Sequence, residues 1–210
     1  MPIGYKVKLD NKSFIIVLLS LIFLKSSGIL ISWVNNFNEP QNQKVLENIW
    51  SNNQESLHYY VIESVIVAPV IEEVLFRGVL FFAAYMLIKE LKNMKKWKFS
   101  NKTNQYITAT LFILVSSFLF SSMHLSQSFL MSLPYLFFGI TLAIIFVITK
   151  NLLITITIHV LNNLLSFFNF FQSHAKQENI LTQEYILLLS LLLISTIIFF
   201  FNKIKTKSHS

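Results

Sequence analysis

Cysteine is absent from all 210 residues of this chain. Without it there is no disulfide, no thiolate nucleophile and no cysteine-based metal site. Charge is also scarce, because charged residues make up 13% of the sequence, whereas a soluble domain usually carries about 25%. Together with 54% hydrophobic residues and a mean hydropathy of +0.58, this balance predicts a protein of the lipid bilayer.

Long apolar runs fill most of the sequence. A bilayer core of ~30 Å needs roughly 20 helical residues. The runs are continuous, whereas membrane strands alternate in polarity and are about 10 residues long. We therefore predict an all-α fold, a polytopic transmembrane helix bundle that forms one membrane domain over residues 1–210. Its six spans are expected at 13–34, 59–88, 106–123, 129–149, 152–171 and 185–201.

The positive charge is distributed as a topology signal. With a cytoplasmic N-terminus, the inner segments hold thirteen lysines and the outer segments two, and Lys25 and Arg77 lie within spans. By the positive-inside rule, both termini are predicted to be cytoplasmic. The first span is interpreted as a retained helix, because Lys25 interrupts its apolar run and no clear cleavage site follows. No soluble segment is long enough for a nucleic-acid-binding domain, so the expected surroundings are membrane lipid, with no nucleic acid.

The second span carries the sequence Glu72-Glu73-Val-Leu-Phe-Arg77. A charge at the centre of a membrane helix costs at least ~2.5–3.5 kcal/mol on insertion scales, so such residues need a partner or a function. Glu73 and Arg77 are four residues apart and can pair on one helix face, while Glu72 lies about 100° around the helix. Adjacent carboxylates in an apolar medium suit a general acid or base. The structural alternative is an ion-pair cluster that joins helices, with Lys25 as a further partner.

Two more polar groups follow on later spans. Phe120-Ser-Ser-Met-His124 closes the third span, where a lone histidine is usually an interfacial residue. His159, Asn162 and Asn163 lie inside the fifth span, with His159 and Asn163 on one helix face. Interhelical hydrogen bonding would explain them without catalysis. Taken together, however, two carboxylates, two histidines, an arginine and an amide on three helices are a set suited to acid–base hydrolysis.

The ordered motifs Glu-Glu-x-x-x-Arg, Phe-x-x-x-His and His-x-x-x-Asn resemble those of the CPBP family, which groups CAAX-processing proteases with bacteriocin-immunity or "Abi" proteins. The resemblance covers about residues 68–165. Gly78 and Gly139 also look like family features. The positions that match the motifs are Glu72, Glu73, Arg77, Phe120, His124, His159 and Asn163.

The resemblance implies a role for each polar residue. Glu72 and His124 would activate a water molecule, and His159 with Asn163 would form an oxyanion hole. Glu73, Arg77, Phe120 and Asn162 would support the site. No cofactor is required by this mechanism. The alternative is a metalloprotease in which Glu72, His124 and His159 bind Zn²⁺; the metal-free mechanism is favoured because Asn163 is a poor zinc ligand and a good oxyanion donor.

The function predicted from these residues is an intramembrane endopeptidase of the CAAX-protease type. Its substrate would be a lipidated, hydrophobic or bacteriocin-like peptide, and its role bacteriocin self-immunity or peptide processing. The Lys-, Asn-, Ile- and Phe-rich composition suggests a bacterial, multi-pass cell-membrane protein. Two other functions remain open: a non-catalytic bacteriocin-immunity protein, and a small proton-coupled transporter that uses Glu72 and Glu73 as a relay.

One geometric conflict arises at this point. If both spans start at the inner surface, His124 lies about 27 Å along its helix from Tyr106, and His159 only about 10 Å along its helix from Leu152. A shared site then requires tilted helices, a helical extension of the basic loop, or different span limits.

Overall fold

The computed structural model describes residues 11–34, 41–52, 56–93, 99–124, 126 and 128–174. All regular structure in these ranges is helical, as predicted. The elements are α1 (Asn11–Val34), α2 (Gln41–Asn52), α3 (Leu57–Ile62), η2 (Glu63–Val67), α4 (Ala68–Glu73), η3 (Val74–Val79), α5 (Leu80–Asn93), α6 (Asn101–Met123), α7 (Phe129–Thr149) and α8 (Leu152–His174).

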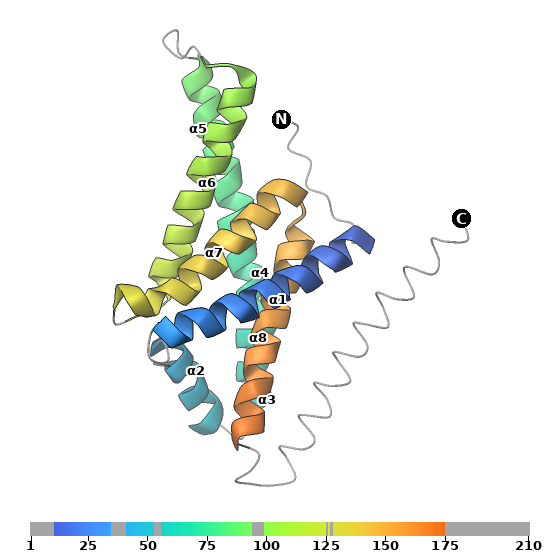
Figure 1. The fold of residues 1–210 in the computed structure, drawn as a ribbon, viewed down its shortest axis with the longest axis vertical. Helices are drawn as coiled ribbons and strands as arrows, with labels where there is room; N and C mark the ends of the chain where they lie inside the picture. Colours follow the sequence, from blue (N-terminus) through green and yellow to red (C-terminus); the bar gives the residue numbers. More distant parts are fainter. Residues whose placement is uncertain are drawn as a thin grey trace, which may run out of the picture.

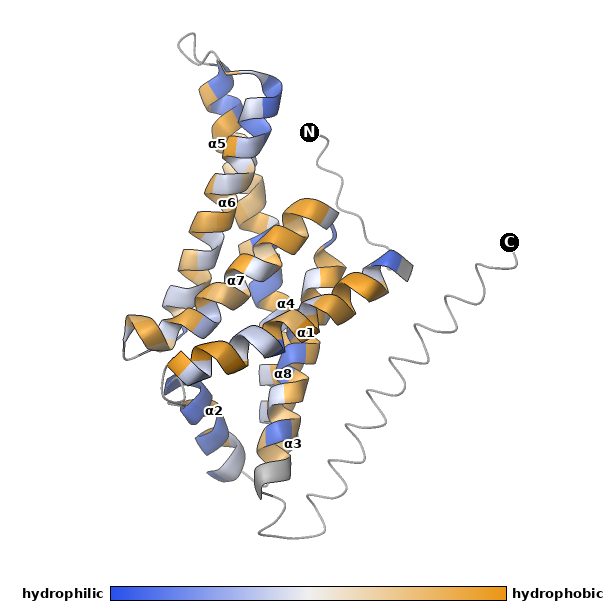
Figure 2. Ribbon diagram, viewed as in Figure 1, coloured by the Kyte–Doolittle hydropathy of each residue, from blue (hydrophilic) through white to orange (hydrophobic). Residues whose placement is uncertain are grey.

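Four of the described helices are long and apolar enough to cross a membrane. They are Lys12–Val34, Asn101–Met123, Phe129–Thr149 and Leu152–Phe171. Figure 2 shows that hydrophobic residues predominate along their ribbons, and many of these residues are exposed. Exposed apolar helices are typical of lipid surroundings. The predicted span at 185–201 and both chain termini lie outside the described residues.

The predicted second span is one helical run over residues 57–93. Two π-helical segments, η2 and η3, interrupt its α-helical geometry on either side of α4. Pro69 stands at the start of α4, and the charged residues Glu72, Glu73 and Arg77 lie in α4 and η3. The run contains all of residues 59–88 and extends beyond them at each end. It is not among the four candidate spans, so its crossing of a membrane stays a prediction.

Helix ends are fixed by short polar side chains. Ser100 caps α6, where its hydroxyl accepts a hydrogen bond from the Thr103 N–H at 3.1 Å, and Ser128 caps α7 in the same way. Lys150 adopts a left-handed conformation with φ of 53° and ends α7. The limits of α7 match the predicted 129–149, whereas α6 starts five residues before the predicted Tyr106.

One helix was not predicted. Residues 35–56 lie between the first two predicted spans, where no helix is predicted, but they contain α2. This helix is amphipathic and buries Trp50 against two aromatic rings of α8, Phe167 at 4.9 Å and Phe170 at 5.3 Å between ring centroids. An isolated tryptophan in an Asn- and Gln-rich segment was the available signal.

The arrangement of the helices removes the conflict over the depth of the two histidines. In Figure 1, the α5–α6 hairpin extends beyond the turn between α7 and α8, so α6 and α8 do not start at one level. Helix α7 crosses at an angle and packs against α6 and α8, and α1 packs against α7 and α8. His124 at the end of α6 and His159 within α8 consequently line the same cavity.

Candidate active site

The two glutamates lie at the end of α4, between the π-helical segments. In η2 the Ala68 N–H bonds to the carbonyl of Glu63, and in η3 the Leu80 N–H bonds to that of Leu75. Both bonds reach back five residues, where an α-helix reaches back four. Such π-turns rotate the residues that follow and leave single carbonyls without their usual partners. They are common at functional sites.

Glu73 is the centre of a buried ionic chain. Its Oε1 lies 3.0 Å from Nη1 of Arg77 and 2.9 Å from Nδ1 of His159, and the Glu73 and Arg77 side chains are both 0% exposed. The predicted Glu73–Arg77 pair is therefore confirmed. Arg77 also donates to the carbonyl of Gly139 at 3.3 Å and lies 4.8 Å from the centre of the Phe120 ring. This chain connects residues 57–93 with α6, α7 and α8.

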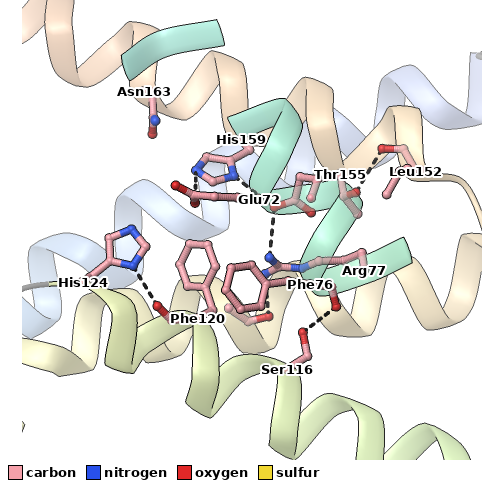
Figure 3. A network of polar contacts seen from close by, with 12 residues as sticks. Glu72, Phe76, Arg77, Ser116, Phe120, His124, Leu152, Thr155, His159 and Asn163 are labelled. Carbon is pink, nitrogen blue, oxygen red and sulfur yellow. Dashed lines mark hydrogen bonds and ion pairs between the residues drawn. The ribbon is translucent and has the colours of Figure 1, made fainter. Parts of the chain in front are cut away.

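Glu72 faces the other way, as its offset around the helix suggested. Its side chain is 28% exposed, and it lines a cavity of about 710 Å³. Its Oε2 lies 3.8 Å from Nε2 of His159 (Figure 3), whereas Glu73 contacts Nδ1, the other nitrogen of the ring. The two adjacent carboxylates thus flank both nitrogens of one imidazole, an arrangement that sequence spacing did not reveal.

His124 is held by a backbone carbonyl. Its Nδ1 lies 2.8 Å from the carbonyl oxygen of Phe120 (Figure 3). A carbonyl only accepts, so Nδ1 carries the hydrogen and Nε2 of the neutral ring is left with its lone pair. The ring stacks on Tyr135 of α7, with 4.3 Å between centroids and an interplanar angle of 23°. Tyr135 was missed from sequence, where a tyrosine in an apolar span gives no specific signal.

Asn163 has a partner that the sequence did not suggest. Its Nδ2 donates to the carbonyl of Ser64 at 3.0 Å. In the π-helical pattern of η2, that carbonyl would pair with the N–H of residue 69, which is Pro69 and has none. Asn163 therefore satisfies a carbonyl that the proline leaves unpaired within the helix. An amide nitrogen carries two hydrogens, so this contact leaves one for another acceptor.

The cavity brings most of the predicted site residues together. Glu72, Phe120, His124, His159, Asn162 and Asn163 all line it. Glu73 and Arg77 do not line it, but they contact His159 and Phe120, which do. Among the residues that the structure describes, no three His, Asp or Glu side chains form a group that could hold a metal ion.

Comparison with family models identifies the class of protein to which this chain belongs. The model for type II CAAX prenyl endopeptidase Rce1-like proteins matches residues 54–165, more than half of the chain. The chain belongs to this family. The resemblance inferred from the motifs is therefore confirmed. Searches of curated proteins and of solved structures gave no match.

Family membership indicates the general class of function. Together with its apolar helices, it makes the chain a multi-pass membrane protein of the CAAX-protease class. The matched region contains every residue of the predicted site, from Glu72 to Asn163. It leaves out α1, which forms one wall of the cavity through residues that include Lys25.

Proposed function

We propose that this chain hydrolyses a peptide bond of a lipidated or hydrophobic peptide inside the cavity, with Glu72 as the general base. Glu72 is the carboxylate that faces the cavity, whereas Glu73 is fully buried in its ion pair. His124 faces the same cavity with its Nε2 free of the hydrogen that Nδ1 carries. A water molecule held between these two groups would be activated for attack.

The reaction then follows ordinary acid–base hydrolysis. The water oxygen bonds to the carbonyl carbon as its proton passes to Glu72, and the carbonyl oxygen becomes an oxyanion. When the carbon–nitrogen bond breaks, Glu72 returns that proton to the leaving amine. The products are a new carboxyl terminus and a free amine, and the enzyme ends in its starting protonation state.

Two donors are available for the oxyanion. Asn163 has one amide hydrogen beyond the one given to Ser64. His159 gives its Nδ1 hydrogen to Glu73, so its Nε2 donates only when this second nitrogen also carries a hydrogen, with Glu73 as the counter-charge. Such preorganised donors are worth about 10²–10³ in turnover each.

The observation that carries the proposal is the position of His159 between the two carboxylates. Contacts of 2.9 Å to Glu73 and 3.8 Å to Glu72 hold one imidazole against a carboxylate that faces the cavity. An ion-pair cluster that only joins helices would need Glu73 and Arg77 and would leave no reason for Glu72, His124 and Asn163 to line a common cavity. The family description favours the same function.

The family description also suggests the substrate. A CAAX sequence is a prenylated cysteine followed by three C-terminal residues. We propose that the bond cleaved is the one after the lipidated cysteine, with release of the three residues that follow. A role in bacteriocin immunity or in another peptide-processing step would use the same chemistry on a different hydrophobic peptide.

Glu72→Gln tests this function. The variant keeps the shape of the side chain and removes the base, so cleavage of a farnesylated CAAX peptide by the purified protein should fall by orders of magnitude. Glu63→Gln, an exposed glutamate on the same helical run, is the matched control and should cleave at the wild-type rate. Equal cleavage by Glu72→Gln would assign the base elsewhere. A wild-type protein that binds peptides and never cleaves them would instead support an immunity protein without catalysis.

A further inference from the structure

Lys25 is a cation in the middle third of the first candidate span, and no carboxylate of the described residues is its partner. Its Nζ lies 3.5 Å from the carbonyl of Asn162 and 3.5 Å from Oγ of Ser166, both on α8. Within the described residues, no glutamate or aspartate comes within ion-pair distance of it. Arg77, a buried cation of the helical run over residues 57–93, is by contrast paired with Glu73. The only hydrogen-bonding contacts of the Lys25 ammonium group within the described residues are thus two long ones to neutral oxygens.

The position of this cation is informative. Lys25 lines the same cavity as Glu72, His124 and His159. An ammonium group in apolar surroundings is costly unless it meets an opposite charge. Because the cavity is also the proposed substrate site, an anionic group of the substrate is the partner whose chemistry fits. Lys25 lies outside the region matched by the family model, so the family resemblance gives it no role.

The spacing along α8 fits a carboxylate at the C-terminus of the cleaved peptide. The contacts of Lys25 lie three and seven residues after His159, which is about 5 to 10 Å along a helix at 1.5 Å per residue. Three residues of extended peptide span about 10 Å, and an ammonium–carboxylate contact adds about 3 Å of reach. A peptide whose cleaved bond lies beside Glu72 and His159 would thus place a carboxylate three residues later within reach of Lys25.

We propose that Lys25 binds the free C-terminal carboxylate of the substrate and so selects peptides in which the cleaved bond lies three residues before the C-terminus. This inference rests on the proposed function and adds a specificity-determining residue to it. Lys25 does not touch the reacting atoms. It positions the peptide so that one particular carbonyl reaches the water held by Glu72.

The test compares two farnesylated peptides that are identical except at the C-terminus. One ends in a free carboxylate three residues after the modified cysteine, and the other ends in a carboxamide. The wild-type protein should show a kcat/KM about 10- to 100-fold higher for the acid than for the amide, the size expected for one enclosed charge pair. In Lys25→Met this ratio should fall to about one, and in Lys25→Arg it should stay well above one.

Controls separate this proposal from the function itself. Lys12→Met removes an exposed lysine from the same helix and should keep the wild-type ratio. An acid peptide with one additional residue should lose the advantage in the wild-type protein, because its carboxylate lies beyond Lys25.

Three outcomes would overturn the inference. The first is a wild-type ratio near one, and the second is an unchanged ratio in Lys25→Met. The third is loss of cleavage of both peptides in Lys25→Met, because this would give Lys25 a role independent of the carboxylate. If the wild-type protein cleaves neither peptide, the proposed function fails and the inference falls with it. Cleavage of both at one rate removes only the inference.

Discussion

The imidazole of His159 lies between Glu73, 2.9 Å from its Nδ1, and Glu72, 3.8 Å from its Nε2. The two carboxylates are neighbours in sequence, yet one is fully buried against Arg77 and the other faces the cavity. In the proposed mechanism this division gives each a separate task. Glu73 orients the ring through a short hydrogen bond, as the carboxylate of a catalytic triad does, and Glu72 is left to act on whatever enters the cavity.

The Glu73–Arg77 pair predicts a loss of stability when its carboxylate is removed. Glu73→Ala leaves the fully buried guanidinium without its carboxylate, and breaking such a pair costs about 3–5 kcal/mol. We expect a clear drop in the thermal unfolding midpoint of the protein in detergent and a lower amount of protein in the membrane.

The double variant Glu73→Leu with Arg77→Met separates stability from activity. Replacing both charges with apolar groups should restore most of the unfolding midpoint, since no charge is left unpaired. Cleavage should stay low, because His159 has lost the acceptor for its Nδ1 hydrogen. Full activity in a stable double variant would contradict an orienting role for Glu73.

Gly139 predicts a second stability effect, through packing. A Cβ added at this position would lie 3.1 Å from Cα of Ser117 on α6 and 3.3 Å from its carbonyl oxygen. Backbone atoms cannot rotate away, so Gly139→Ala should push α6 and α7 apart and cost about 1–3 kcal/mol. Gly78→Ala is the matched control, because a Cβ there meets nothing within 4 Å. Equal unfolding midpoints for the two variants would argue against close α6–α7 contact.

Local features of the molecule could be predicted from sequence. The limits of α7 agree because a continuous apolar run ends at polar residues, with Ser128 capping its start. The Glu73–Arg77 pair agrees because a spacing of four residues fixes both side chains on one face of a single helix. In each case the information lies within one turn or one element of the chain.

Contacts between distant helices could not be predicted in the same way. Asn163 pairs with the carbonyl of Ser64, 99 residues earlier, and its reason lies in a π-turn and in Pro69. His124 stacks on Tyr135 across a helix–helix turn. Neither periodicity nor spacing encodes how two helices rotate against each other, so the site residues could be named while most of their partners could not.

The topology gives a prediction that reaches beyond the described residues. If the N-terminus is cytoplasmic and residues 57–93 cross the membrane as the four candidate spans do, there would be five crossings and the end of α8 would face outward. A cytoplasmic tail therefore requires residues 185–201 to cross as well. Reporter fusions after Asn53 should report an external site, and fusions after Lys96 and Lys207 a cytoplasmic one. An external tail would reduce the bundle to five crossings.

Asn163 predicts a kinetic effect that exceeds its effect on stability. Asn163→Ala removes one proposed oxyanion donor, so kcat should fall by about 10²–10³ with little change in KM. The lost hydrogen bond to Ser64 should cost about 1 kcal/mol of unfolding free energy. Asn169→Ala, an exposed asparagine on the same helix, should change neither quantity. A variant of Asn163 that loses stability while keeping kcat would restrict the residue to a structural role.

Metal removal provides the last prediction, because it separates the two mechanisms that share these residues. A zinc ion would have to lie ~2.0–2.2 Å from Glu72, His124 and His159 at once, and the described residues contain no group of three acidic or histidine side chains that could hold one. We therefore expect protein stripped with a strong chelator to keep cleaving the farnesylated peptide, with metal content measured on the same sample.

Under this mechanism the oxyanion depends on its hydrogen-bond donors, so stripping should also leave the effect of Asn163→Ala unchanged. One equivalent of zinc per chain, lost together with activity and restored together with it, would contradict the glutamate mechanism. Glu72, His124 and His159 would then be ligands, and the metal would carry the charge assigned here to Asn163 and His159.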